Sequence, residues 1–233
     1  QDFLLPPLLF NTKAGIFHIK ASFKRQKKNE QGVQENKGTS MTDIVFIRMA
    51  SYIDEKIPHP ENVMFPIDIA TMMSIADQNG VNYRLIDTEA DPMPVENLIN
   101  RLKDYSPDYV VIKSKTSSSD APAKVLSVEG PRFIGIGQAF SKDGATLLRS
   151  HPSVDVAIIT EPEIVFRSIL ENNFDYSKVS GISILDDSTG EVVKKPGELV
   201  KELDDLPSPK YEAFLGKNYY SYYPTPFMGK KKM

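Results

Sequence analysis

Two apolar runs of strand length in tandem, each followed by a turn and a helix-like segment, most constrain how this chain can fold. The first unit has a strand at residues 132–136 and a helical stretch at 141–150. The second has a strand at 154–159 and an acidic turn at 160–163 that opens another helix. Such units build parallel strands, so both turns are expected at one edge of one sheet. In open α/β sheets, ligands bind at this carboxyl edge.

The same alternation continues upstream. Apolar runs typical of buried strands occupy 43–49, 83–87 and 108–114, and helical patterns occupy 67–78, 95–105 and 121–128. Strands that alternate with helices at this spacing predict an α/β fold with a doubly wound parallel sheet of five strands. Right-handed crossovers would then bury both faces of the sheet.

The remaining segments differ in composition. Residues 1–40 combine a proline-broken apolar run with basic and polar tracts, and we expect a disordered leader or upstream segment there. The α/β domain is expected at 41–175, followed by a β-hairpin and linker at 176–210. Residues 211–233 form an extended aromatic and basic tail with no helical or strand period.

Composition excludes several functions. The 233 residues carry a net charge of −3, which gives no general attraction to nucleic acid or to an anionic membrane. Cysteine is absent, which removes disulfides, thiolate metal sites and cysteine-ligated iron–sulfur clusters. No apolar run approaches the roughly 20 residues of a membrane helix, and we expect a cytoplasmic protein. His18, His59 and His151 show no metal-ligand spacing.

Gly135 and Gly137 are the first candidates for ligand binding. A dinucleotide fingerprint needs a third glycine and a place after the first strand, whereas Phe140 stands at the third position here and the pair follows the fourth strand. The two glycines can let a ligand approach the backbone, or they can simply form a tight turn. Both interpretations stay open.

Acidic and hydroxyl side chains follow two other strands. Glu161 and Glu163 can act as a carboxylate pair, face a ligand, or favour the dipole of the helix that they begin. Ser114, Thr116 and Ser117 can donate hydrogen bonds to a ligand, or cap the next helix. We favour ligand-facing loop positions over catalysis, and no catalytic residue or protein metal ligand is predicted.

In its order of motifs, the chain resembles the N-terminal cobalamin-binding domain of B12-dependent radical SAM enzymes. The resemblance covers about residues 43–223. It rests on the following stretches: Phe65-Pro66 before the first helix, LIDTEA at 85–90, SPDYVVI at 106–112, IGIG at 134–137, VDVAIITEPE at 154–163 and LDDLPSP at 203–209.

This resemblance implies a flavodoxin-like (Rossmann-like) fold that holds cobalamin at the carboxyl edge of its strands, often without a histidine on cobalt. The cofactor-binding residues that it implies lie in four loops: Arg48, Ser51, Tyr52, Ser114, Thr116, Ser117, Gly135, Gly137, Gln138, Thr160, Glu161 and Glu163. Glycines would let the corrin approach the backbone, and hydroxyls and amides would bond its amide side chains.

The missing cysteines imply that no iron–sulfur cluster belongs to this chain, which would be a truncated or split module without catalytic activity of its own. A radical SAM partner chain or C-terminal domain would supply the catalysis of a methyltransferase or cyclase. One alternative is a non-catalytic interaction domain that kept the fold, lost the cofactor and docks through its aromatic tail. A nucleotide-binding domain that uses the Gly135–Gly137 turn is the third hypothesis.

Overall fold

The structure is a computed structural model that describes residues 42–50, 64–115, 120–215, 220–221 and 231–232. All of them belong to the unit formed by residues 41–233. The expected disordered leader at 1–40 lies outside the described residues, as does most of the tail beyond residue 215.

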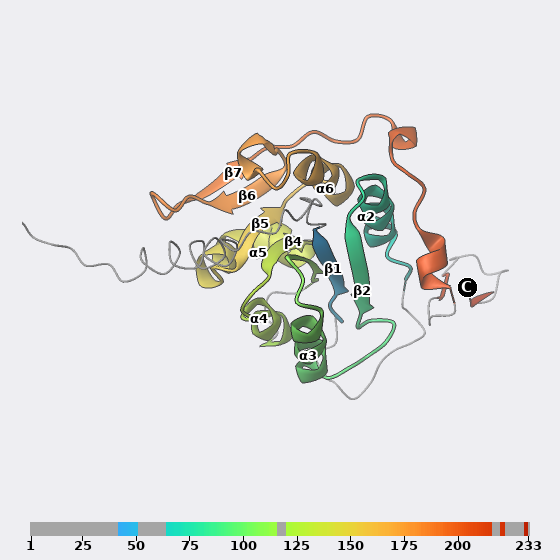
Figure 1. Cartoon of the computed structure of the whole chain (residues 1–233). Coiled ribbons are helices and arrows are strands. Elements are labelled where there is room, and N and C mark those ends of the chain that lie inside the picture. The colour runs from blue at the N-terminus through green and yellow to red at the C-terminus, as the bar shows by residue number, and fades with distance from the viewer. Residues whose placement is uncertain (1–41, 51–63, 116–119, 216–219, 222–230, 233) are drawn as a thin grey trace, which may run out of the picture. The chain divides into compact units, whose positions relative to one another are not determined.

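A parallel sheet forms the centre of this unit (Figure 1). Its five parallel strands follow the order β2-β1-β3-β4-β5, which is the flavodoxin-like order and confirms the predicted doubly wound sheet. The strands are β1 (Asp43–Arg48), β2 (Asn82–Asp87), β3 (Tyr109–Lys113), β4 (Arg132–Ile136) and β5 (Val154–Ile158).

Helices cover both faces of the sheet. On one face, α2 (Ile67–Gln78) and α6 (Pro162–Glu171) pack on a core that contains Phe46 and Phe166. On the other face, α3 (Val95–Tyr105), α4 (Asp120–Leu126) and α5 (Gln138–Ser150) pack on a second core that contains Phe133. Figure 1 shows α3 and α4 on the opposite side of the sheet from α2 and α6. No helix among the described residues is long and apolar enough to cross a membrane.

The predicted hairpin extends the same sheet to seven strands. After α6 and a short 3₁₀ turn, η2 (Tyr176–Lys178), strands β6 (Ile182–Leu185) and β7 (Val192–Lys195) pair antiparallel beyond β5. Ile158 pairs with Ile182, and Ile182 pairs with Lys195. The end of β7 therefore returns to the carboxyl edge of the parallel strands.

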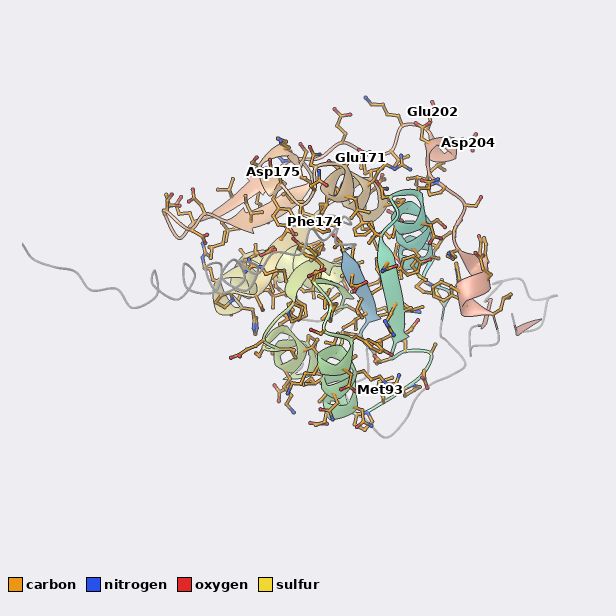
Figure 2. All side chains as sticks on the ribbon, viewed as in Figure 1. Met93, Glu171, Phe174, Asp175, Glu202 and Asp204 are labelled. Carbon is orange, nitrogen blue, oxygen red and sulfur yellow. The ribbon has the colours of Figure 1, made fainter. Side chains whose placement is uncertain are left out.

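The chain beyond β7 runs past α6 and then alongside α2 (Figure 1). It includes η3 (Leu203–Asp205) and η4 (Tyr211–Phe214), and Glu202 and Asp204 are exposed on it (Figure 2). Arg167 on α6 donates to the carbonyl of Asp205 at 2.8 Å. In the tail, where no strand was expected, β8 (Tyr220–Ser221) and β9 (Lys231–Lys232) form a short antiparallel pair.

Gly135 in β4 has a packing role. A methyl group at this position would overlap the ring of Phe140, a fully buried side chain in the first turn of α5. The aromatic ring thus occupies the space that a side chain at residue 135 would need. Close helix–strand packing gives a sufficient reason for this glycine.

We expect Gly135→Ala to lower the free energy of unfolding by about 1–3 kcal/mol, because overpacking a dense core forces side chains off their rotamers. Gly190→Ala is the control, since Gly190 has a φ of +69° and open space around its Cα. That change creates no steric overlap, so its cost of about 1–2 kcal/mol would come from the left-handed conformation alone. Urea denaturation measures both, and an unchanged stability of Gly135→Ala would contradict the packing role.

Candidate functional site

A pocket of about 510 Å³ lies at the carboxyl ends of β3, β4 and β5, the edge at which the sequence predicts a ligand. Its volume is within the range of small-molecule sites. The pocket combines aliphatic walls with a few polar groups. Its lining residues are Asp68, Lys113, Ile136, Gly137, Ser141, Ile158, Ile159, Thr160, Glu161, Pro162 and Leu199.

Gly137 turns the chain directly from β4 into α5. Its φ is +87°, and a methyl group here would lie 2.8 Å from the carbonyl oxygen of Ser114. This sharp turn starts α5 at Gln138, three residues earlier than the sequence pattern predicts. The N–H of Ala139 donates to the Ser114 carbonyl at 3.1 Å, and that of Ser141 donates to Gly137 at 3.0 Å. The backbone N–H groups of Ala139 and Ser141 at the start of α5 are therefore already bonded to main-chain carbonyls.

An ion pair joins the end of β3 to the first turn of α2. Lys113 Nζ lies 2.6 Å from Asp68 Oδ2, and both side chains are about four-fifths buried (22% and 19% exposed). Sequence reasoning did not select either residue as part of the site. Lys113 ends an apolar strand and Asp68 occupies a first helical turn, and both are ordinary positions for charged residues.

Glu163 lies in the first turn of α6, close to this ion pair. Burial raises the pKa of its carboxyl, and the negative charges of Asp68 and Glu161 raise it further. Lys113 acts in the opposite direction. Lys113 is the only cation among the described residues that line the pocket, and Asp68 already pairs with it. Glu161 and Glu163 add two more acids, so another negative charge is unfavourable in this part of the pocket.

Thr160 and Glu161, at the end of β5, both line the pocket. The Thr160 hydroxyl oxygen is buried and has no hydrogen-bond partner within the part of the chain that the structure describes. The Glu161 carboxylate accepts a hydrogen bond of 2.7 Å from the backbone N–H of Val200. Glu161 is therefore engaged with the segment that follows β7.

Arg48, at the end of β1, belongs to a buried ionic cluster. Its guanidinium lies 3.3 Å from Asp87 at the end of β2, contacts Glu89 and donates to the carbonyl of Met64 at 2.7 Å. Lys115 reaches Glu89 from the surface at 2.9 Å. The guanidinium thus holds three segments together at the β1–β2 half of the edge.

The structure brings some of the sequence-predicted site residues together and separates others. Gly137, Thr160 and Glu161 line the pocket, and Glu163 lies beside it. Ser114 is buried under the start of α5, Gln138 is exposed there, Gly135 packs on Phe140, and Arg48 is in its ionic cluster. Ser51, Tyr52, Thr116 and Ser117 lie outside the described residues.

Leu199 is the pocket residue that is hardest to predict from the sequence. It comes from the segment after β7, outside the predicted five-stranded domain. No helical or strand periodicity marks it. Within the described ranges, no group of histidine, aspartate and glutamate side chains could hold a metal ion.

Strand order and pocket position together define a flavodoxin-like α/β domain with a candidate ligand site at its carboxyl edge. No family model and no curated protein sequence matches this chain.

Solved structures do match. The cobalamin-dependent S-adenosylmethionine radical enzyme OxsB, with aqua-cobalamin and S-adenosylmethionine bound, aligns with a TM-score of 0.63 at 18% identity. The radical S-adenosylmethionine methyltransferase TsrM from Kitasatospora setae, with cobalamin and a [4Fe-4S] cluster bound, aligns with a TM-score of 0.53 at 10% identity. At these identities the similarity establishes the fold.

The aligned regions cover 76% and 72% of this chain but only 25% and 31% of OxsB and TsrM. This chain therefore spans a minor part of those enzymes.

We expect Arg48→Ala to lower the free energy of unfolding by about 3–5 kcal/mol, because it removes the guanidinium from two buried carboxylates. Lys115, whose side chain is 55% exposed, is the surface partner of Glu89. Lys115→Ala should therefore change the free energy of unfolding by at most about 1 kcal/mol. Urea denaturation of both variants measures the difference. Equal effects would contradict the structural importance of the buried cluster.

The raised pKa of Glu163 predicts a pH-dependent effect of Glu163→Gln. A carboxyl whose pKa is raised by folding stabilises the protein below its unfolded pKa, and this contribution is lost as pH rises through the folded pKa. We therefore expect the variant to be more stable than the parent protein at pH 7, with the gain shrinking toward pH 4. Urea denaturation at both pH values checks this.

Glu96→Gln is the matched control, because Glu96 also lies in a first helical turn but is exposed beside Lys124. Its charge favours the helix dipole, so this substitution should leave stability unchanged or lower it by a few tenths of a kcal/mol at pH 7. A gain of equal size in both variants would show that burial is not the cause.

Proposed function

We propose that this chain is a cobalamin-binding module whose ligand lies at the carboxyl edge of β3, β4 and β5. The observation that carries the proposal is the pocket at this edge, in a fold shared with two structures that contain cobalamin. When bound, cobalamin would supply alkyl-transfer chemistry at its cobalt.

The residues at the pocket fit a large neutral ligand with an apolar ring system and amide side chains. Ile136, Ile158 and Ile159 offer apolar surface. Ser141, exposed at the start of α5, can donate hydrogen bonds to the amide side chains and accept hydrogen bonds from them. The pocket is smaller than a whole cobalamin molecule, so it would hold one portion while the rest lies across the edge.

A nucleotide is less well supported as the ligand. Phosphate sites at helix N-termini depend on free backbone N–H groups, and here Ala139 and Ser141 donate to main-chain carbonyls. Lys113 is the one cation among the lining residues, and Asp68 already neutralises it. The nearby Glu161 and Glu163 add negative charge that would repel a phosphate.

A module of this kind would need a catalytic partner. OxsB and TsrM are described as radical enzymes, and this chain aligns with about a quarter to a third of each. We propose that a radical SAM domain or partner chain supplies the rest. Methyl transfer or cyclisation would then be the activity of the assembly.

A second candidate is a non-catalytic interaction domain. Met64, Ile67, Tyr211 and Leu215 are exposed apolar side chains, and Tyr211 stacks on Phe65 with ring centroids 5.0 Å apart. Apolar side chains that gather on a surface mark interaction sites. The aromatic tail of this hypothesis lies mostly outside the described residues.

Co-elution with hydroxocobalamin tests the proposal. The full chain is incubated with hydroxocobalamin or with flavin mononucleotide and passed through a gel-filtration column, and the visible spectrum of the protein peak is recorded. We expect the cobalamin spectrum, and not the flavin spectrum, to co-elute with the protein. Colourless protein with both would favour the interaction domain, and flavin alone would favour a nucleotide site.

Ser141→Trp places an indole at the pocket and should abolish co-elution of hydroxocobalamin. Lys142→Trp is the matched control, because Lys142 is the next residue of α5, is exposed and does not line the pocket. If Ser141→Trp still bound hydroxocobalamin as well as Lys142→Trp does, any cobalamin site would lie elsewhere.

A further inference from the structure

Residues 196–202, which we call the strap, follow β7 at the ligand edge of the sheet. Lys195 pairs with Ile182, which in turn pairs with Ile158 at the carboxyl end of β5. The strap therefore starts beside the pocket, and its Leu199 is part of the pocket lining.

The first anchor of the strap is a close contact between two glycines. A methyl group on Gly197 would lie 2.6 Å from the Cα of Gly181 and 2.8 Å from the Thr160 hydroxyl. Gly181 has a φ of +78°, and a side chain there would collide with Thr160 and Val165. The strap backbone can thus rest on the end of β5 because neither position carries a side chain.

The second anchor is the hydrogen bond from the Val200 N–H to Glu161 Oε2, at 2.7 Å. Hydrogen bonds to an ionised acceptor are stronger than those between neutral groups. Glu161 is the N-cap residue of α6, yet its side chain makes no capping bond to that helix. Its carboxylate instead holds the strap.

Leu199 lies between the two anchors and is 69% exposed while it lines the pocket. An exposed leucine in a loop ordinarily samples several positions, but contacts at residues 197 and 200 fix the backbone on both sides of this one. An apolar part of a ligand that enters the pocket would cover this side chain and remove its apolar surface from water.

We propose that Leu199 is a ligand-contacting, specificity-determining residue, and that Glu161 and Gly197 are positioning residues that hold it over the pocket. The inference rests on the proposed function for the identity of the ligand. It assigns Glu161 to the strap, and it assigns to Leu199 an apolar portion of the ligand.

Amide hydrogen exchange tests the anchor without any ligand. We expect Glu161→Ala to lose protection at the Val200 amide, and Glu161→Gln, which keeps an acceptor oxygen, to retain most of it. Glu198→Ala is the control, because Glu198 is an exposed neighbour paired only with Lys201 in the described structure, at 3.2 Å. Protection of the β4 amides confirms folding of every variant. An unchanged Val200 amide in Glu161→Ala would overturn the anchor.

Titration with hydroxocobalamin tests the contact. Leu199→Ala should weaken binding about tenfold, the effect of losing part of a leucine side chain from an apolar contact. Glu161→Ala should weaken binding by a similar factor. The double variant should bind no more weakly than Leu199→Ala alone, because one residue acts through the other.

Three results would overturn the proposal. Additive losses in the double variant would mean that Glu161 contacts the ligand directly. Unchanged binding by Leu199→Ala would remove this residue from the site. No binding by the parent protein would refute the proposed function and the ligand contact together, while the exchange experiment would still decide whether Glu161 anchors the strap.

Discussion

A parallel sheet has to bury both of its faces, and this requirement determines where the polar chemistry of the molecule can lie. The five parallel strands are rich in isoleucine and valine, and helices cover each face. Every connection from a strand to the next helix must then leave from the same edge. Charged and hydroxyl side chains that have no place in the two apolar cores lie at the carboxyl ends of these strands, among them Arg48, Lys113 and Thr160.

The two halves of this edge use their charges differently. At the ends of β1 and β2, the Arg48 guanidinium pairs with Asp87 and Glu89 in a buried cluster. At the ends of β3 to β5, the Asp68–Lys113 pair borders a pocket with aliphatic walls. Charges in a low-dielectric interior have to be paired. The charges of the first half are therefore engaged with one another, whereas the second half leaves surface that a ligand can cover.

Local sequence patterns predicted the fold well because the forces that form its elements act over short distances. The helices at 67–78 and 95–105 have the predicted bounds, since apolar periodicity and a following Asn-Gly or Pro define them. The start of α5 was predicted three residues late, because the sequence alone does not reveal that Gly137 adopts a positive φ.

The lining of the pocket was only partly predictable. Gly137, Thr160 and Glu161 follow strands, and strand ends can be read from the sequence. Leu199 lies on a segment without periodicity, and the hydrogen bond that the Val200 N–H donates to Glu161 spans 39 residues along the chain. Contacts of this kind depend on the course of the chain after β7, which no local pattern encodes.

The strap and the sheet contribute differently to the candidate site. The sheet and its two apolar cores hold the domain together, and this fold is shared with OxsB at 18% identity. Leu199, in contrast, lines the pocket from the strap, which lies outside the five parallel strands. The Glu161 carboxylate and the contact between Gly181 and Gly197 hold the strap in place. Substitutions in such a segment change the surface that a ligand meets while they leave the sheet intact. At the pocket, Lys113 is paired with Asp68 and lies near Glu163, so this site favours an uncharged part of a ligand over a phosphate group.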